Sequence, residues 1–150
     1  MAYEFGFDVL RMDLEPMELS DEEAEAAEEA PGFELMASSG DVSAHIYLDR
    51  DDITWLIREI EAAEETEEAR PGGPWEPQLP LMRGFFFHPR LRLVGGEVLA
   101  PGQVDDEGEP IEFWEIRVDD EDGSQVILRL SESVLRGLLR QLREAPAQAH

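Results

Sequence analysis

The sequence predicts an α+β fold in which an antiparallel sheet carries two main helices on one face. Two observations carry this prediction. Hairpins with alternating apolar residues occur twice, at 33–48 and 111–130, and a segment with helical apolar spacing follows each of them. Each helix has one narrow apolar stripe, which must be buried on a sheet because an isolated amphipathic helix is marginally stable in water.

The N-terminal segment predicts a strand followed by a short acidic helix. Apolar and polar residues alternate from Tyr3 to Leu14, and the phase slips near Val9 and Leu10. Such a slip indicates a bulge or bend within a strand. Residues 20–30 then favour a short helix, because Ser20 is a good N-cap and alanines and acids follow it.

The first hairpin and helix occupy residues 33–68. Strands are expected at 33–37 and 42–48, joined by a Ser-Ser-Gly-Asp turn. Asp49 is the expected N-cap of a helix that runs to about Glu68. The apolar stripe of this helix consists of Ile53, Leu56, Ile57 and Ile60. Carboxylates crowd its C-terminal end, where they oppose the helix dipole, so we expect a weak last turn.

A proline-rich segment separates the two hairpin–helix units. Residues 70–80 hold four prolines and two glycines, which predicts a linker or an extended strap. Strands are expected at 82–88 and 90–94, with Gly95-Gly96 closing the second of them. Residues 97–100 favour one further short strand.

The second hairpin and helix follow the pattern of the first. An Asp-Gly turn joins strands at 111–119 and 124–130, which is a strong hairpin signal. Ser131 is the expected cap of the last helix. The stripe of that helix consists of Leu135, Leu138, Leu139 and Leu142. The tail from Ala145 is expected to fray.

The two units suggest an internal repeat within a single compact domain, 1–150. A shift of 82 residues places Ile53 on Leu135, Leu56 on Leu138, Ile57 on Leu139, Ile60 on Leu142 and Arg58 on Arg140. The repeated parts would be 1–70 and 81–145, joined by the strap at 70–80, and would form two pseudo-symmetric strand–hairpin–helix units. The alternative is that any two hairpin–helix units share these periods.

The net charge is −24, from 36 acids and 12 bases, and every base is arginine. Residues 1–75 carry a charge of −18, and residues 76–150 carry the remaining −6. One explanation is a high-GC genome or a saline host. The other is that the acidic surface attracts a basic partner at long range.

Composition also excludes several classes of function. The absence of cysteine excludes disulfides, thiolate metal sites and a cysteine nucleophile. Nucleic acid and anionic membranes require a basic surface, so neither is an expected direct partner. No apolar segment approaches the roughly 20 residues that span a bilayer, and no signal peptide is visible. We therefore expect a soluble cytoplasmic protein.

Candidate catalytic groups are sparse, and we expect no enzyme, no cofactor and no metal. The three histidines are His45, His88 and His150, and only His45 has a nearby carboxylate on its own strand face, Asp49. No Gly-x-Ser-x-Gly motif accompanies the serines. Residues 105–109 resemble a fragment of a calcium loop but lack its ligand spacing.

Partner-binding residues are expected on the two acidic helices. Trp55 is placed roughly opposite the apolar stripe of its helix, and an exposed tryptophan is typical of a binding hot spot. The alternative is that it packs beneath the strap near Trp75. The acidic candidates are Asp21, Glu22, Glu25, Glu28, Glu29, Glu59, Glu61, Glu64 and Glu65. Arg136, Arg140 and Arg143 are expected to pair within the protein with its excess acids.

The leading hypothesis is a non-enzymatic acidic module, such as an adaptor, inhibitor or immunity-type protein, that engages a basic protein. In its sharpest form the acids mimic nucleic acid. An alternative is an assembly protein, for instance a homodimer, that self-associates through a sheet edge, with acidity that reflects its host. A third hypothesis is a carboxylate enzyme that uses a metal.

Overall fold

Short strands and two amphipathic helices make up the structure, a computed structural model that describes residues 4–16, 32–40, 42–72, 75, 89–105 and 107–148. The strands are β1 (Glu4–Asp8), β2 (Arg11–Pro16), β3 (Phe33–Ser39), β4 (Val42–Leu48), β5 (Arg90–Arg92), β6 (Gly95–Leu99), β7 (Trp114–Asp119) and β8 (Gln125–Leu130). The helices are α2 (Arg50–Glu64) and α3 (Glu132–Gln148).

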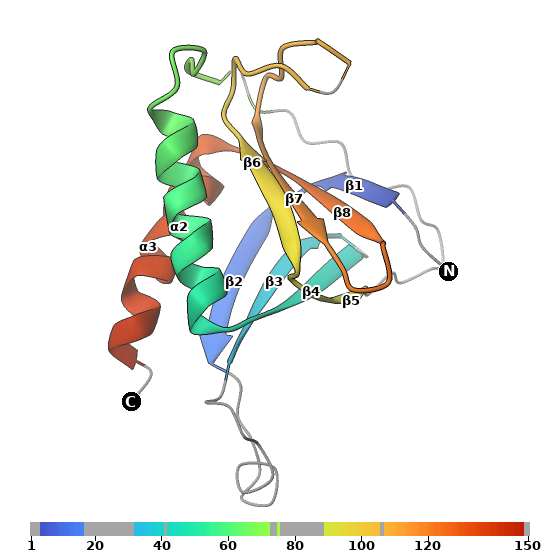
Figure 1. The fold of residues 1–150 in the computed structure, drawn as a ribbon, viewed down its shortest axis with the longest axis vertical. Coiled ribbons are helices and arrows are strands. Elements are labelled where there is room, and N and C mark those ends of the chain that lie inside the picture. Colours follow the sequence, from blue (N-terminus) through green and yellow to red (C-terminus); the bar gives the residue numbers. More distant parts are fainter. Residues whose placement is uncertain are drawn as a thin grey trace, which may run out of the picture.

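The strands form two four-stranded sheets, with the orders β1-β8-β7-β6 and β2-β3-β4-β5 (Figure 1). The hairpins β3–β4 and β7–β8 are antiparallel, as predicted. However, β1 pairs in parallel with β8, and β4 pairs in parallel with β5. The α+β class is confirmed, but two sheets with mixed pairing replace the single antiparallel sheet that the sequence predicted.

The first long strand passes from one sheet into the other at Val9 and Leu10. The Val9 N–H donates to the carbonyl of Arg129 at 2.8 Å, and the Leu10 N–H donates to the carbonyl of Ser38 at 3.0 Å. Successive amides therefore bond to opposite sheets. The predicted bend near Val9 and Leu10 is this crossing point.

A second long strand makes the same kind of crossing between β5 and β6. The Leu93 N–H donates to Tyr47 at 3.3 Å and the Val94 N–H donates to Asp119 at 3.1 Å. The two sheets are thus joined at both of their shared edges. Gly95 and Gly96, which were expected to end a strand, instead begin β6.

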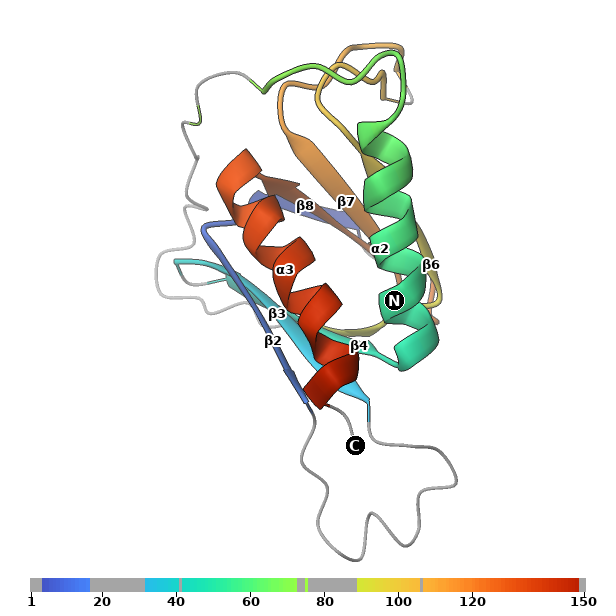
Figure 2. The same cartoon turned by 90° about the vertical axis from the view of Figure 1, so that its left-hand side faces the viewer.

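One hydrophobic core lies between the sheets and the helices. Inward positions alternate along each hairpin strand, and the burial of β3, β4, β7 and β8 follows this alternation strictly. The helix residues in the core are Ile53, Leu56, Ile60, Ala63, Leu135, Leu138, Leu139, Leu142 and Ala145. Figure 2 shows the two helices side by side in front of the sheets, so they cover the same side of the molecule.

Helix α2 begins at a reciprocal capping box and ends early. The Asp49 carboxylate accepts from the Asp52 N–H at 2.7 Å, and the Asp52 carboxylate accepts from the Asp49 N–H at 2.9 Å. The helix ends at Glu64, before the predicted end near Glu68. This early end agrees with the predicted weak last turn.

Helix α3 begins after the predicted cap and continues beyond the predicted end. The Ser131 hydroxyl accepts from the Val134 N–H at 3.2 Å. The helix runs to Gln148, and Ala145 is buried in the core, so the expectation of fraying from Ala145 is wrong. The apolar contact of Ala145 with the core stabilises the additional turn.

Three expected features lie outside the described residues: the helix at 20–30, the strand at 82–88 and most of the strap. The two halves share one order of elements, which is a crossing strand, a hairpin and a helix. In the first half β1 pairs in parallel with β8, and in the second half β5 pairs in parallel with β4. In each case the partner is the last hairpin strand of the other half. Pseudo-symmetry and duplication remain a prediction.

Candidate functional site

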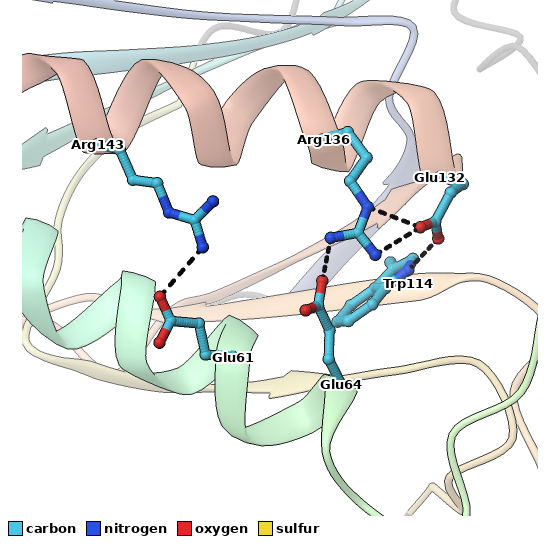
Figure 3. Close-up of polar contacts among 6 residues, drawn as sticks. All are labelled: Glu61, Glu64, Trp114, Glu132, Arg136 and Arg143. Carbon is cyan, nitrogen blue, oxygen red and sulfur yellow. Dashed lines mark hydrogen bonds and ion pairs between the residues drawn. The ribbon is translucent and has the colours of Figure 1, made fainter.

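Carboxylates of α2 face arginines of α3 along the contact between the two helices. Glu61 accepts from the Nη2 of Arg143 at 3.2 Å, and Glu64 pairs with the Nη1 of Arg136 (Figure 3). The earlier residue of α2 meets the later residue of α3, so the helices run antiparallel. The prediction that α3 arginines pair with excess acids is confirmed for Arg136 and Arg143.

Glu132, in the first turn of α3, connects this contact to the sheet. One of its oxygens accepts from the indole Nε1 of Trp114 at 2.7 Å. The other accepts from Arg136, with both Nε and Nη2 at 2.8 Å (Figure 3). Trp114 is 3% exposed, so its N–H needs a partner within the protein. Glu132 supplies that partner and also holds Arg136 in place.

The environment of Arg136 strengthens its positive charge. Partial burial alone would lower the pKa of this guanidinium. The hydrogen bond and charge of Glu132, followed by those of Glu64, outweigh this effect and raise the pKa above its ordinary value. Arg136 therefore stays charged and acts as a permanent bridge between the two carboxylates.

A cleft of about 550 Å³ opens beside this network. It lies where the C-terminal end of α2 meets the N-terminal end of α3. Its lining comprises Glu64, Ala69, Arg70, Pro71, Gly72, Ala100, Pro101, Trp114, Glu132 and Arg136. This volume falls within the range of about 300–1,000 Å³ that is usual for small-molecule sites, so we take the cleft as the candidate site.

A close contact between two loops forms one wall of the cleft. The Arg70 N–H donates to the carbonyl of Pro101 at 2.7 Å. The next residue, Gly102, has φ +96, and a Cβ at this position would lie 2.1 Å from the carbonyl oxygen of Glu68. Only glycine permits both this backbone conformation and this approach.

Two charged groups in the cleft lining have unused hydrogen-bonding capacity. The guanidinium of Arg70 is exposed and has no side-chain partner within the described part of the chain. Of the Glu64 carboxylate oxygens, only Oε1 has a partner among these residues, namely Arg136. With respect to the described residues, the cleft therefore presents one donor group and one acceptor, of opposite charge, that have no partner.

Trp55 does not lie on an exposed helix face. Its side chain is half-buried and packs against the core. Gly96 lies beneath it, with the Trp55 Cη2 3.6 Å from the position that a Cβ would occupy. The exposure predicted for Trp55 is therefore wrong. Trp75 packs edge-on against Phe113 with ring centroids 4.9 Å apart. Most of the strap lies outside the described residues, so the alternative that Trp55 packs beneath it stays a prediction.

The acidic candidates fall into three groups. Glu61 and Glu64 face α3 and are paired with arginine. Glu59 and Glu65 have no cation partner within the described ranges. The remaining candidates, Asp21, Glu22, Glu25, Glu28 and Glu29, lie outside the described residues.

Sequence reasoning did not identify Trp114, Glu132 or Arg70 as site residues. Trp114 reads as an ordinary strand residue, and Glu132 as a favourable acid in the first turn of a helix. The contact of Glu132 with Trp114 spans 18 residues, and that of Glu64 with Arg136 spans 72. Local periodicity carries no signal for contacts at these separations.

His45 lies on β4, and its Nδ1 is 2.5 Å from the Glu34 carboxylate on β3. His88 and His150 lie outside the described residues. Within the described residues, no group of three or more histidines and carboxylates is arranged to hold a metal ion. Neither of the helices described here is long and apolar enough to cross a membrane.

Comparison with models of protein families, with curated proteins and with solved structures finds no match for this chain. Function is therefore inferred from its own residues.

Proposed function

We propose that the protein is a non-enzymatic acidic binding module that engages a basic protein partner through the C-terminal end of α2. The chain that follows this helix contributes Glu65, Glu67 and Glu68, all of which are exposed. Half-buried Glu59 lies on α2 itself, more than one turn before Glu65. These four residues define the acidic end of α2.

The observation that carries the proposal is that, within the described residues, no cation pairs with the carboxylates of this acidic end. The last turn of α2 contains no basic residue, and the four carboxylates have no cation partner among the described residues. Carboxylates at a helix C-terminus oppose the dipole and repel one another. Their presence therefore lowers the stability of the helix end, and cations supplied by a partner would relieve this cost.

The use of the arginines supports the same conclusion. Arg11, Arg92, Arg117, Arg129, Arg136 and Arg143 all form ion pairs with carboxylates of the chain itself. Half of the twelve arginines are thus paired with acids of the chain, which leaves the 36 acids in large excess over the remaining bases. The net charge of −24 would draw a basic partner toward this surface at long range.

Self-association through a sheet edge has less support. The outer edge of β2 is covered, because the Gln141 side chain accepts from the Leu14 N–H and donates to the Met12 carbonyl. A strand of a second chain could pair with this edge of β2 only by displacing the two hydrogen bonds of Gln141.

The test compares two variants that remove the same charge. In one, Glu65, Glu67 and Glu68 are replaced by glutamine; in the other, exposed Glu97, Glu107 and Glu109 are replaced. Partners captured from the host are identified by mass spectrometry, and affinities of a purified partner are measured between about 50 and about 300 mM salt.

We expect a basic partner whose affinity falls steeply with salt and falls by about tenfold or more in the α2 variant. The control variant should weaken binding much less. Competition by duplex DNA would identify the nucleic-acid-mimic form. The proposal fails if the partner is not basic, if salt has no effect, or if both variants weaken binding equally.

A further inference from the structure

The cleft between the helix ends combines an apolar surface with charged groups of both signs. Ala69 and Pro71 supply accessible apolar surface, whereas Ala100, Pro101 and Trp114 belong to the lining but are almost fully buried. The two carboxylates of Glu64 and Glu132 and the two guanidinium groups of Arg70 and Arg136 make the lining neutral overall. A neutral cleft is unusual in a chain whose acids outnumber its bases by 36 to 12.

Arg70 is the most informative of these groups. Six other arginines pair with carboxylates, yet Arg70 has no carboxylate partner within the described part of this acidic chain. Its backbone is held, since its N–H bonds to the Pro101 carbonyl at 2.7 Å. A guanidinium on an anchored backbone is well suited to bidentate contact with a ligand carboxylate.

The rest of the lining is held by its own contacts. Trp114 is fixed by Glu132 at 2.7 Å, and Glu132 and Glu64 are both bound to Arg136. A free Glu64 oxygen is therefore presented from a side chain that the network already orients. Groups held in this way need little reorganisation when a ligand binds.

We propose that this cleft binds a small zwitterion of the α-amino-acid type with an apolar side chain. The ligand carboxylate would pair with Arg70 and its ammonium with Glu64, and its side chain would lie against Ala69 and Pro71. A simple anion would gain Arg70 but face Glu64, Glu132 and the overall negative charge. A simple cation would gain Glu64 but face Arg70 and Arg136. A ligand that carries both charges satisfies both of the groups that lack a partner among the described residues.

This site goes beyond the proposed protein-binding surface and has a separate test. The full chain is titrated with the apolar α-amino acids, leucine first, by calorimetry and by NMR of the tryptophan indole N–H signals. Two leucine analogues serve as probes that each lack one charge: 3-methylbutylamine and 4-methylpentanoate. We expect at least one amino acid to bind, and both of its single-charge analogues to bind about tenfold more weakly or worse.

Point variants locate the site. Arg70→Gln and Glu64→Gln are each expected to weaken amino-acid binding by about tenfold or more, whereas Arg58→Gln and Glu97→Gln outside the cleft leave it unchanged. Glu64→Gln also removes an ion pair, so thermal unfolding is measured in parallel. Arg70→Gln removes no side-chain hydrogen bond or ion pair to the described residues and provides the decisive comparison.

Three results would overturn the proposal. The first is that no apolar amino acid binds at concentrations up to about 10 mM. The second is that 4-methylpentanoate or 3-methylbutylamine binds as tightly as leucine. The third is that Arg70→Gln binds the amino acid as tightly as the parent chain does. N-acetyl-leucine keeps the carboxylate and side chain of leucine but lacks the ammonium, as does the carboxyl end of a peptide. If it bound as tightly as leucine, recognition of the ammonium would be contradicted in the same way as by equal binding of 4-methylpentanoate. The variant at Glu65, Glu67 and Glu68 should retain amino-acid binding, so failure of one proposal is separable from failure of the other.

Discussion

The side-chain oxygen of Gln141 on α3 lies 2.7 Å from the backbone nitrogen of Leu14 on β2 and accepts its hydrogen bond. The amide nitrogen of the same side chain donates to the carbonyl of Met12 at 3.0 Å. One helix side chain thus satisfies a donor and an acceptor at the outer edge of β2, where a neighbouring strand would otherwise bond. This contact ties α3 to the second sheet and protects an edge that could pair with another chain.

Replacement of Gln141 tests the importance of this edge contact. Gln141→Ala leaves the Leu14 N–H and the Met12 carbonyl without their partner, so we expect the free energy of unfolding to fall by about 1–3 kcal/mol. Denaturant unfolding measures the change. Arg140→Ala, at the exposed neighbouring position, should change stability by no more than about 0.5 kcal/mol. Equal effects of the two substitutions would show that the edge contact contributes nothing specific.

The two interhelical ion pairs should differ in strength. Glu64 is 28% exposed and Arg136 is 50% exposed, whereas Glu61 and Arg143 are 47% and 56% exposed and lie 3.2 Å apart. Double-mutant cycles to glutamine should give a coupling of about 0.5–1 kcal/mol for Glu64 with Arg136 and close to zero for Glu61 with Arg143. Added salt should reduce the larger value. A larger coupling energy for Glu61 with Arg143 than for Glu64 with Arg136 would contradict this prediction.

Two glycines offer opposite predictions. Gly102→Ala places a Cβ 2.1 Å from the Glu68 carbonyl in a left-handed conformation, so we expect it to lower the free energy of unfolding by about 1–3 kcal/mol. It should also weaken any binding in the cleft. Gly137→Ala lies within α3 with no atom near the new Cβ, so stability should rise by about 0.5–1 kcal/mol. Thermal unfolding of both variants checks the signs, and a neutral Gly102→Ala would show that the loops separate without cost.

Asp52 and Asp122 should give stability profiles of opposite slope against pH. Burial and the nearby charge of Asp49 raise the pKa of Asp52 above its ordinary value of 3.8, against a hydrogen bond from the Asp49 backbone that lowers it. The folded state therefore binds a proton more readily at Asp52, and its contribution to stability is lost as pH rises through the folded pKa. The stability of Asp52→Asn relative to the parent should increase as pH rises from about 3 to about 6.

For Asp122, side-chain and backbone hydrogen bonds from Ser124 lower the pKa below 3.8. Its contribution is present above that value and is lost as pH falls, so the stability of Asp122→Asn relative to the parent should decrease as pH rises. Denaturant unfolding at several pH values measures both profiles. Parallel slopes for the two variants would contradict the proposed environments.

Local patterns predicted much of the secondary structure. Alternation located both hairpins, the phase slip at Val9 and Leu10 marked the crossing between sheets, and the caps at Asp49 and Ser131 marked both helix starts. These features depend on neighbouring residues and on the 2.0 and 3.6 residue periods. The exposure of Trp55 was predicted wrongly because helical spacing describes an isolated helix. In the structure the Trp55 ring packs against Gly96 of β6.

The sequence by itself determined the α+β class, the apolar stripes and the acidity, and it predicted the pairing of Arg136 and Arg143 with acids of the chain. Only the tertiary structure decided that β1 pairs with β8 and β4 with β5, and that Glu64 meets Arg136. Each of these contacts joins segments that are far apart in the chain. From the sequence alone, other strands could equally have paired with β1 or β4, and other carboxylates could equally have paired with Arg136. In the structure, one shared core buries both helix stripes and both inner sheet faces together, and this burial is a property of the whole fold that no local pattern encodes.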